Sequence, residues 1–417
     1  MNHFHYRENI LYCEDIPLTE IVSETGTPCY VYSYKTLERH FKAFDEAFKK
    51  QKHLTCFSVK ANSNLTVLNI FKSLNSGFDI VSGGELFRVL KIGTDPKKIV
   101  YSGVGKRADE IEYALKSGIL MFNVESFDEL YKINEIAEKL DLKAPVALRV
   151  NPDVDPKTHP YISTGLKKNK FGINIKNAMK WYNTANSLNN INVIGVDCHI
   201  GSQLTEISPF VDALKKVKEL IDTLKESDIN IEYLDIGGGL GVTYKEEIPP
   251  SPEEYAQAVI DTIKDIDVTL ILEPGRVIVA NAGVLLSKVL YKKSGDVKNF
   301  VIVDAAMNDL IRPSLYEAYQ EIVSVTVKQG SKEKVDIVGP ICETGDFLGQ
   351  DRDFEELAQG DLIAVRSAGA YGFTMSSNYN SRPKVAEVLV KDDKFKVIRK
   401  RETYNDLIRG EDLEFDF

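Results

Sequence analysis

Lys60 stands where a buried strand is expected to end. The segment LTCFSVK (54–60) is mostly apolar or β-branched and predicts a buried strand, whereas the following ANSN (61–64) is polar and typical of a loop. A lysine in this position is most often a solvated strand end. The alternative is an amine held in a partly desolvated site, where it can act as a nucleophile. The rest of the sequence has to decide between these interpretations.

Other residues able to do chemistry stand at the carboxyl ends of other apolar segments. His199 lies near the end of VIGVDCHIGS, and Glu273 follows TLIL. Each alone has an ordinary structural explanation, but their convergence on one end of several strands favours a site. Asp79 and Arg149 look like supporting residues and receive no firm role. The complete set is Lys60, Asp79, Arg149, His199, Ser202, Gly237, Gly238, Gly239, Glu273 and Arg276.

The glycine run in DIGGGLG (235–241) indicates which ligand this set would bind. Three successive glycines leave backbone N–H groups able to close on a phosphate, although a tight turn also explains them. A phosphate site combined with a nucleophilic lysine indicates an aldehyde cofactor that carries a phosphate, namely pyridoxal 5′-phosphate (PLP), bound to Lys60 as a Schiff base. Glu273 is then predicted to keep the pyridine nitrogen protonated, and His199 to lie against the opposite face of the ring.

The second half of the chain carries a different group of polar residues. Arg312 and Tyr316 are four residues apart in MNDLIRPSLYEA, and Cys342 and Glu343 lie among Gly and Pro in GPICETGDF. Tyr371 is flanked by small residues in AGAYGFTMSSNYN. Singly these are ordinary loop residues, so their value depends on their combination.

The elements that must position these residues follow from the apolar pattern. Eight βα units in roughly 240 residues predict a (β/α)8, TIM-like barrel, whose enzymes place their chemistry at the carboxyl ends of the strands. A doubly wound open sheet is the rival, but it usually has fewer strands, and no GxGxxG follows the first strand. The expected strands are 54–60, 78–84, 99–105, 120–126, 146–152, 193–202, 233–241 and 269–276.

After residue 280 the pattern changes to β-type segments bounded by turn residues. These predict an antiparallel β-sandwich or barrel, which also takes the strand-like segment 27–34 near the N-terminus. The expected domains are a PLP-binding barrel over 37–276 and a β-domain over 1–36 and 277–417. Within the barrel, part of the long connection, residues 153–170, is long enough to act as a lid.

Composition excludes several classes of protein. The 417 residues carry a formal net charge of −10, and no basic segment is interleaved with aromatics, which argues against a nucleic-acid partner. No secretory signal and no apolar stretch of membrane-spanning length are visible. The five cysteines are scattered without CxxC spacing, which fits reduced thiols in the cytoplasm and neither disulfides nor a protein-bound metal.

Several motifs together carry a family resemblance. FSVKAN, HIGSQ, DIGGGLG, EPGR, RPSLYEA, CETGDF and AGAYGFTMSSNYN resemble the diaminopimelate decarboxylases, which belong to the alanine-racemase-like (fold type III) PLP-dependent decarboxylases. The resemblance covers essentially the whole chain, in the family's order and spacing. It implies decarboxylation of meso-2,6-diaminopimelate to L-lysine and CO2, the last step of lysine biosynthesis, in the cytoplasm.

The resemblance also implies roles for individual residues. Lys60 would hold the cofactor, His199 would stack on its ring, and Cys342 would donate a proton in the active site of a partner subunit. Family members are head-to-tail homodimers with shared sites, so a homodimer is implied. The cofactor would also contact Ser202, Gly237, Gly238, Gly239, Glu273, Pro274, Gly275, Arg276 and Tyr371, and the substrate would contact Arg276, Arg312, Tyr316, Glu343 and Tyr371.

Residue chemistry supports this substrate, while some alternatives stay open. Diaminopimelate carries a second carboxylate and a second ammonium at the end distant from the reacting carbon. A guanidinium can bind that carboxylate bidentately, and Glu343 suits that ammonium. Arg276 or Arg312 could instead bind the cofactor phosphate. FSVKAN and EPGR also occur in ornithine and arginine decarboxylases. Another decarboxylase, acting on ornithine, arginine or carboxynorspermidine, is therefore the main alternative. The β-rich half argues against a non-enzymatic PLP-binding barrel, and Glu273 at the ring nitrogen argues against a racemase.

Overall fold

The computed structural model describes residues 2–154 and 170–414, which form two compact units. The first unit comprises residues 40–243 and 247–278 within these ranges. The second comprises residues up to 39, residues 244–246, and residues from 279 onward. The expected boundaries at 36/37 and 276/277 stay a prediction, and the possible lid at 153–170 lies almost entirely outside the described residues.

The first unit is a closed parallel barrel. Eight parallel strands pair in chain order, β9 pairs with both β8 and β11, and β13 returns to β5, so the sheet closes. This confirms the predicted eight-stranded barrel over the open sheet. The short strand β10 (Ile173–Asn174) pairs alongside β9. The barrel strands are β5 (His53–Ser58), β6 (Gly77–Ile80), β7 (Ile99–Tyr101), β8 (Met121–Val124), β9 (Ala144–Asn151), β11 (Ile191–Asp197), β12 (Tyr233–Asp235) and β13 (Thr269–Leu272).

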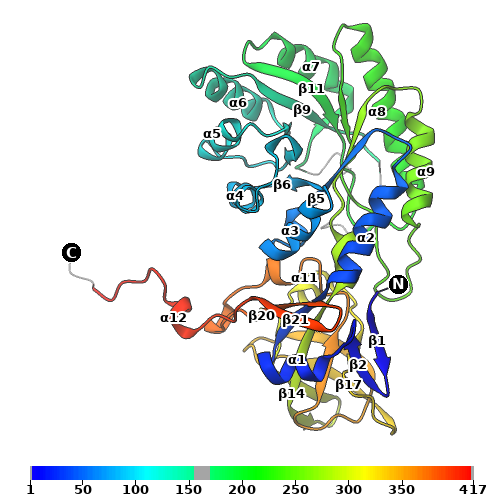
Figure 1. Cartoon of the computed structure of the whole chain (residues 1–417), viewed down its shortest axis with the longest axis vertical. Coiled ribbons are helices and arrows are strands. Elements are labelled where there is room, and N and C mark those ends of the chain that lie inside the picture. The colour runs from blue at the N-terminus through cyan, green and yellow to red at the C-terminus, as the bar shows by residue number, and fades with distance from the viewer. Residues whose placement is uncertain (1, 155–169, 415–417) are drawn as a thin grey trace. The chain divides into compact units, whose positions relative to one another are not determined.

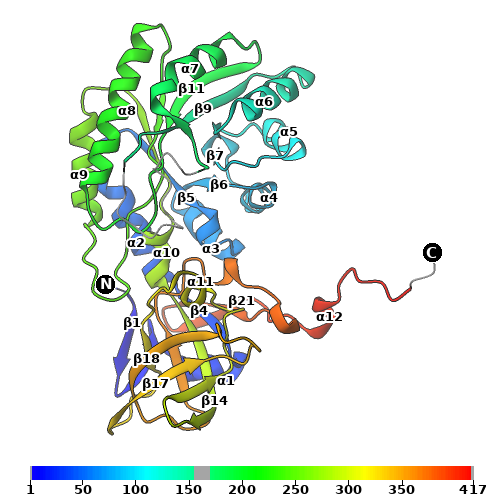
Figure 2. The ribbon, with the colours of Figure 1, turned by 180° about the vertical axis from the view of Figure 1, so that it is seen from behind.

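Amphipathic helices cover the outside of this barrel, as Figures 1 and 2 show. Several begin at a side-chain cap: Ser126 accepts a hydrogen bond from the Glu129 N–H, and Ser251 forms a capping box with Glu254. Their apolar faces are buried against the strands, which explains why the strands themselves are almost continuously apolar. The helices are α3 (Leu65–Ser73), α4 (Gly83–Lys91), α5 (Ala108–Ser117), α6 (Phe127–Lys139), α7 (Ala178–Ser187), α8 (Ser208–Glu226) and α9 (Pro252–Ile263).

The second unit is built on a mixed sheet. Its path runs β18-β17-β15-β14-β4-β20-β21, and β19 pairs with β14 and β16. Strand β4 (Cys29–Ser33) joins this sheet, which confirms the prediction for residues 27–34. Most pairs are antiparallel, but β4–β20 and β15–β17 are parallel. The other strands are β14 (Gly283–Ser294), β15 (Asn299–Val303), β16 (Ile322–Ser324), β17 (Lys332–Val338), β18 (Phe347–Glu355), β19 (Leu362–Val365), β20 (Ala386–Lys391) and β21 (Lys394–Arg399).

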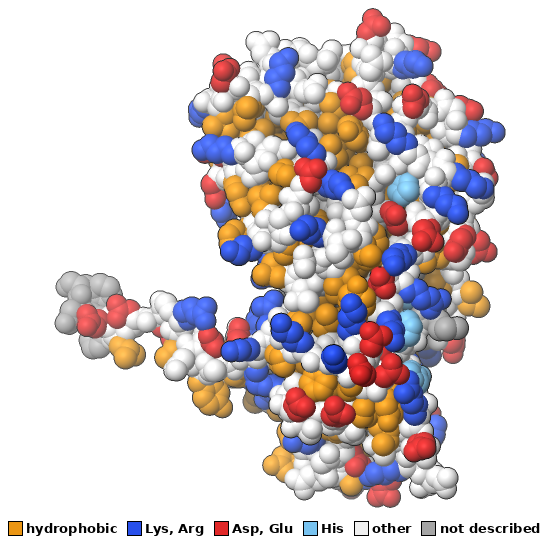
Figure 3. All heavy atoms as spheres, viewed as in Figure 1, with side chains coloured by type: hydrophobic (Ala, Val, Ile, Leu, Met, Phe, Trp, Pro, Cys, Tyr) orange, Lys and Arg blue, Asp and Glu red, His pale blue; other side chains and the backbone are white. Residues whose placement is uncertain are grey.

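Basic and acidic side chains are interspersed on the face of the molecule drawn in Figure 3, as is usual for a solvated surface. None of the described helices is long and apolar enough to cross a membrane. Within the described ranges, no group of three or more His, Cys, Asp or Glu side chains is placed to hold a metal ion.

Candidate active site

Lys60 lies directly after β5, in a short 3-10 turn (Val59–Ala61) at the carboxyl end of the barrel. Its Nζ donates a hydrogen bond of 2.8 Å to Oδ2 of Asp79, which is fully buried at β6. Ser58 Oγ donates to the same oxygen at 2.8 Å, and the other oxygen, Oδ1, has no hydrogen-bond partner in the described part of the chain. The amine is therefore held by a buried carboxylate, and its side chain is only 37% exposed, unlike a simple solvated strand end.

Glu273 follows β13 and is buried at the same end of the barrel. Its Oε1 accepts a hydrogen bond of 3.1 Å from Ser102 Oγ. Burial raises the pKa of Glu273 well above its ordinary value; nearby Asp235 and Asp79 raise this pKa further, while Lys60 opposes the shift. A group that brings positive charge to this carboxyl would reverse the penalty and favour its ionised form.

His199 is held as a neutral imidazole. Burial lowers its pKa well below the ordinary value, and the positive charges of Arg149 and Lys60 lower it further. The Gly238 N–H donates to His199 Nδ1 at 3.2 Å, so the ring proton belongs on Nε2. A neutral, flat ring in this position suits packing against another planar ring.

The close contacts of the glycine run with the His199 ring and the Gly201 backbone leave no room for side chains. Gly237 has φ +65°, and a Cβ there would stand 2.2 Å from His199 Nδ1. Gly239 has φ +119°, and a Cβ there would stand 2.7 Å from the Gly201 carbonyl oxygen. Both positions therefore need glycine for steric and conformational reasons. The run forms a narrow backbone cradle beside the imidazole, in which the Gly237 N–H is bonded to Asp235 Oδ1 and the Gly238 N–H to His199 Nδ1.

The remaining predicted barrel residues meet beside this cradle. Arg276 Nη2 donates to Ser202 Oγ at 3.1 Å, although 74 residues separate them in the chain. The Glu273 N–H bonds the Gly237 carbonyl at 2.8 Å, and the Pro274 carbonyl accepts the Ser58 N–H at 3.0 Å. The EPGR segment is thus joined to both the glycine run and the strand that precedes Lys60. Arg276 begins the short helix α10 (Arg276–Val279).

Arg149 is a buried support for this group. Its guanidinium lies 2.9 Å from Glu125 Oε1 and 3.9 Å from Asp197 Oδ2, and its Nη2 reaches the His199 carbonyl at 3.4 Å. The second Glu125 oxygen accepts the Gly172 N–H at 3.0 Å. Glu125 therefore ties the backbone at residue 172 to the arginine that supports His199.

The site residues predicted in the second half of the chain lie in the second compact unit, the β-domain. Arg312 and Tyr316 begin and end the short helix α11 (Arg312–Tyr316), and the Arg312 guanidinium lies 4.6 Å from the centre of the Tyr244 ring. Ser314 on this helix donates to the Gly345 carbonyl at 2.6 Å, which joins α11 to the CETGDF loop. The basic helix and the loop of Cys342 and Glu343 are therefore neighbours, as one substrate pocket would require.

The CETGDF loop exposes Cys342 and Glu343. Cys342 is exposed, and its N–H bonds Asn380 Oδ1 at 2.9 Å. Glu343 Oε2 accepts a hydrogen bond of 2.7 Å from the Tyr379 hydroxyl. Tyr371 lies at φ +55°, a left-handed backbone conformation that a tyrosine adopts only where its surroundings impose it.

The barrel residues fit PLP chemically. Lys60 supplies an amine, Arg276 supplies a guanidinium beside the glycine run, and Glu273 supplies a carboxyl that burial keeps neutral until a cation arrives. The buried Asp79 oxygen without a partner in the described part of the chain provides a further acceptor for a ligand group.

Comparison with known proteins agrees with this fit. Residues 34–280 match the pyridoxal binding domain of the pyridoxal-dependent decarboxylases. Diaminopimelate decarboxylase of Vibrio cholerae is 56% identical over 409 residues, 98% of each chain. The structure of diaminopimelate decarboxylase from M. jannaschii with L-lysine superposes with a TM-score of 0.95 at 41% identity, covering 99% of both chains. The Helicobacter pylori enzyme with L-lysine gives 0.91 at 46% identity, over 94% of this chain and 98% of that one.

The chain belongs to the diaminopimelate decarboxylase family. Membership confirms the recognition that the sequence motifs suggested and, with it, PLP as the cofactor. The roles of individual residues rest on the geometry above and stay predictions.

Several buried residues of this family member's site were missed from the sequence. Ser102, Asn123, Glu125 and Asp235 all lie at or just beyond strand ends, in SGVG, FNVES and YLDIG. Their position at the ends of predicted strands was the available signal. They lack a distinctive motif because Ser, Asn, Asp and Glu are common wherever a strand gives way to a loop.

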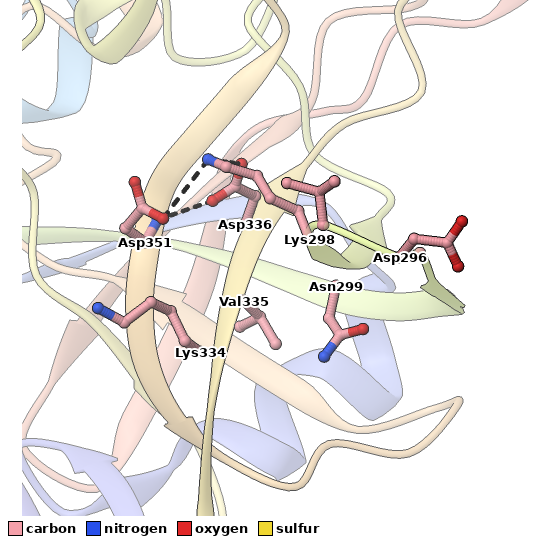
Figure 4. A pocket seen from close by; sticks show the side chains of 9 residues that line it. Asp296, Lys298, Asn299, Lys334, Val335, Asp336 and Asp351 are labelled. Carbon is pink, nitrogen blue, oxygen red and sulfur yellow. Dashed lines mark hydrogen bonds and ion pairs between the residues drawn. The ribbon is translucent and has the colours of Figure 1, made fainter.

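A surface pocket in the β-domain, of about 260 Å³, contains none of the predicted site residues. Lys298 lines this pocket and forms ion pairs with Asp336 at 2.9 Å and Asp351 at 3.4 Å (Figure 4). The protein's own lysine thus balances part of the charge of the two carboxylates.

Proposed function

We propose that this chain decarboxylates meso-2,6-diaminopimelate to L-lysine and CO2 with PLP. The observation that carries the proposal is the Lys60 amine, 2.8 Å from buried Asp79 and at the same end of the barrel as Glu273, in a chain 56% identical to a diaminopimelate decarboxylase. PLP, when bound, supplies an electron sink for the pair left behind when CO2 departs.

The barrel residues would hold this cofactor. Lys60 would bind it covalently, His199 would pack on its ring, and Glu273 would pair with its ring nitrogen. Asp79 would hold the Lys60 amine in the site through its hydrogen bond of 2.8 Å. The remaining holding groups would be Ser202, Gly237, Gly238, Gly239, Pro274, Gly275, Arg276 and Tyr371.

The β-domain residues would select the substrate and return a proton. Arg312 and Tyr316, with Arg276, suit a far carboxylate, whereas Glu343 suits a far ammonium. Cys342 Sγ would deliver the proton that replaces CO2. Its exposure in a single chain supports a role in the site of a second subunit, so we propose a head-to-tail homodimer with shared sites. The free state of the described cysteines supports a cytoplasmic location.

Substrate specificity provides the test. The purified chain with PLP should release CO2 and lysine from meso-diaminopimelate with a kcat/KM at least roughly 100-fold above that for ornithine or arginine. Both of these lack the second carboxylate, so the protein groups that would bind it are left unpaired. Preference for either alternative would overturn the substrate assignment.

Attachment of the cofactor provides a second readout. Borohydride reduction followed by peptide mass spectrometry should find the cofactor on Lys60, and Lys60→Ala should abolish both the label and turnover. Lys97→Ala, which removes an exposed lysine of the same barrel, should change neither. Wild-type turnover by Lys60→Ala would refute the proposed role of the lysine.

A further inference from the structure

Asn123 lies fully buried in β8, beneath the predicted cofactor-binding residues. Its amide nitrogen donates two hydrogen bonds, to Asp235 Oδ2 at 2.9 Å and to Ser102 Oγ at 3.0 Å. Its amide oxygen has no hydrogen-bond partner in the part of the chain that the structure describes. The Asn123 side chain therefore acts here only as a donor, towards one carboxylate and one hydroxyl.

This arrangement fixes the direction of the Ser102 hydroxyl. Because Ser102 Oγ accepts from Asn123, its own proton points to Glu273 Oε1, 3.1 Å away. Asp235 meanwhile receives two N–H donors, from Asn123 and from the Gly237 backbone at 2.9 Å. Glu273 receives the single hydroxyl, and the two carboxyl groups are near enough for each to affect the ionisation of the other.

The number of donors decides which of the two acids ionises first. A carboxylate that accepts more N–H bonds is the stronger acid, so Asp235 ionises before Glu273. In agreement, burial raises the pKa of Asp235 only to about 6 because Asn123 and Gly237 oppose it, whereas the pKa of Glu273 rises well above its ordinary value.

The charges facing this pair do not reverse the order. Asp79 and Asp197 add negative charge near Glu273, while Lys60 and Arg149 add positive charge. Lys60 lowers the pKa of Glu273, but Asp79 and Asp235 outweigh it. The proton shared by the acid pair therefore lies on Glu273.

We propose that Asn123 is a positioning residue that places the shared proton of the Asp235–Glu273 pair on Glu273, through Asp235 directly and through Ser102. The inference rests on the proposed function, in which Glu273 meets the ring nitrogen of PLP. On binding, the proton leaves Glu273 and the ring nitrogen gains it, so Glu273 becomes a carboxylate and Asp235 stays ionised. The protein thus delivers its own proton to the electron sink, with no exchange with solvent.

Isotope-edited infrared spectroscopy of the full chain tests this directly. The protein is freed of PLP, held near neutral pH and labelled with 13C in either the glutamate or the aspartate carboxyl carbons. We expect a protonated-carboxyl band that shifts with the glutamate label. This band should be absent in Glu273→Gln and should disappear on titration with PLP. A band that follows the aspartate label and is lost in Asp235→Asn, or the absence of any Glu273 band, would overturn the proposal.

Variants then test the part played by Asn123. Asn123→Leu, of similar size, removes both donors and should transfer the band from the glutamate to the aspartate label. Ser102→Ala should shift the Glu273 band to higher frequency, because the carboxyl loses its donor, and it keeps the test available if Asn123→Leu does not fold. An unchanged Glu273 band in both variants would show that Asn123 is only structural.

Asn308→Leu is the matched control, since Asn308 is also buried and donates to a buried aspartate, Asp309, at 3.2 Å in the β-domain. It should leave the Glu273 band unchanged; a change equal to that of Asn123→Leu would overturn the assignment to Asn123. These measurements use no substrate, so they stay distinct from failure of the decarboxylase assay.

Discussion

Lys106 forms a buried ion pair whose loss should destabilise the barrel strongly. Its side chain is 1% exposed, and its Nζ donates to Glu129 Oε1 at 2.6 Å and to the carbonyls of Gly103 and Asn123 at 2.7 Å each. Glu129 is 5% exposed and also accepts the Glu125 N–H at 2.9 Å. Lys106→Met removes the cation and leaves a buried carboxylate and two carbonyls without their donor.

The expected loss follows from that burial. Breaking a buried pair by removing one partner typically costs about 3–5 kcal/mol, because the other charge stays buried and uncompensated. For a unit of this size, the melting temperature should fall by roughly 6–20 °C. The matched control is Lys116→Met, which breaks an exposed pair with Glu112 whose side chains are 58% and 47% exposed. Such exposed pairs four residues apart on a helix contribute only about 0.3–0.5 kcal/mol.

Urea unfolding followed by tryptophan fluorescence measures this difference. The chain has a single tryptophan, Trp181, which lies in α7 and stacks on Phe127 with ring centres 3.4 Å apart, so its emission reports the barrel. Lys106→Met/Glu129→Gln should be more stable than Lys106→Met alone, since the uncompensated charge is gone. A Lys106→Met loss below about 1 kcal/mol, or equal to that of Lys116→Met, would refute the reasoning.

Three further outcomes are expected. Arg312→Lys should raise KM for diaminopimelate by roughly 10–100-fold, because a bidentate contact to the substrate is lost. The dissociation constant of PLP, measured by fluorescence titration, should not change. Cys342→Ala should lower kcat more than KM, and equal changes in both would argue against proton donation. Burial raises the pKa of Asp309 to about 7, so its ionisation costs stability as pH rises from about 4 to about 7, by roughly 4 kcal/mol in all. Asp309→Asn should therefore flatten the pH dependence of unfolding in that window, as measured by urea titrations at several pH values.

The barrel was predictable because its strands are buried on both faces. Each of the eight appears as an apolar segment, and polar residues such as Lys60 and Glu273 stand out against it. The β-domain was less accessible, because the parallel pairing of β4 with β20 joins residues about 350 positions apart and leaves no local pattern. Lys60 itself lies in a 3-10 turn beyond the strand, a boundary shift of the usual size.

The buried polar network of the site was not predictable for a related reason. Ser102 and Glu273 are 171 residues apart, and Asn123 and Asp235 are 112 apart, so their contacts depend on closure of the barrel. Nothing in a single strand distinguishes a buried asparagine that donates to a carboxylate from one that faces a loop. The reactive residues at the strand ends could be located from the sequence. The hydrogen-bond partners that set the protonation of each residue could be identified only from the folded structure.

The balance of buried charge explains why these partners matter. Among the described residues of this site at the carboxyl end of the barrel, acidic groups outnumber basic ones. The acidic groups are Asp79, Glu125, Asp197, Asp235 and Glu273, and the basic groups are Lys60, Arg149 and Arg276. This excess of acids makes ionisation of Glu273 unfavourable by itself. Asp235 is the acid with the most N–H donors of the pair and carries the negative charge, so Glu273 is left with the proton. A cationic ring nitrogen beside Glu273 would compensate this penalty, which is why the proton can pass from Glu273 to the ring nitrogen when the cofactor binds.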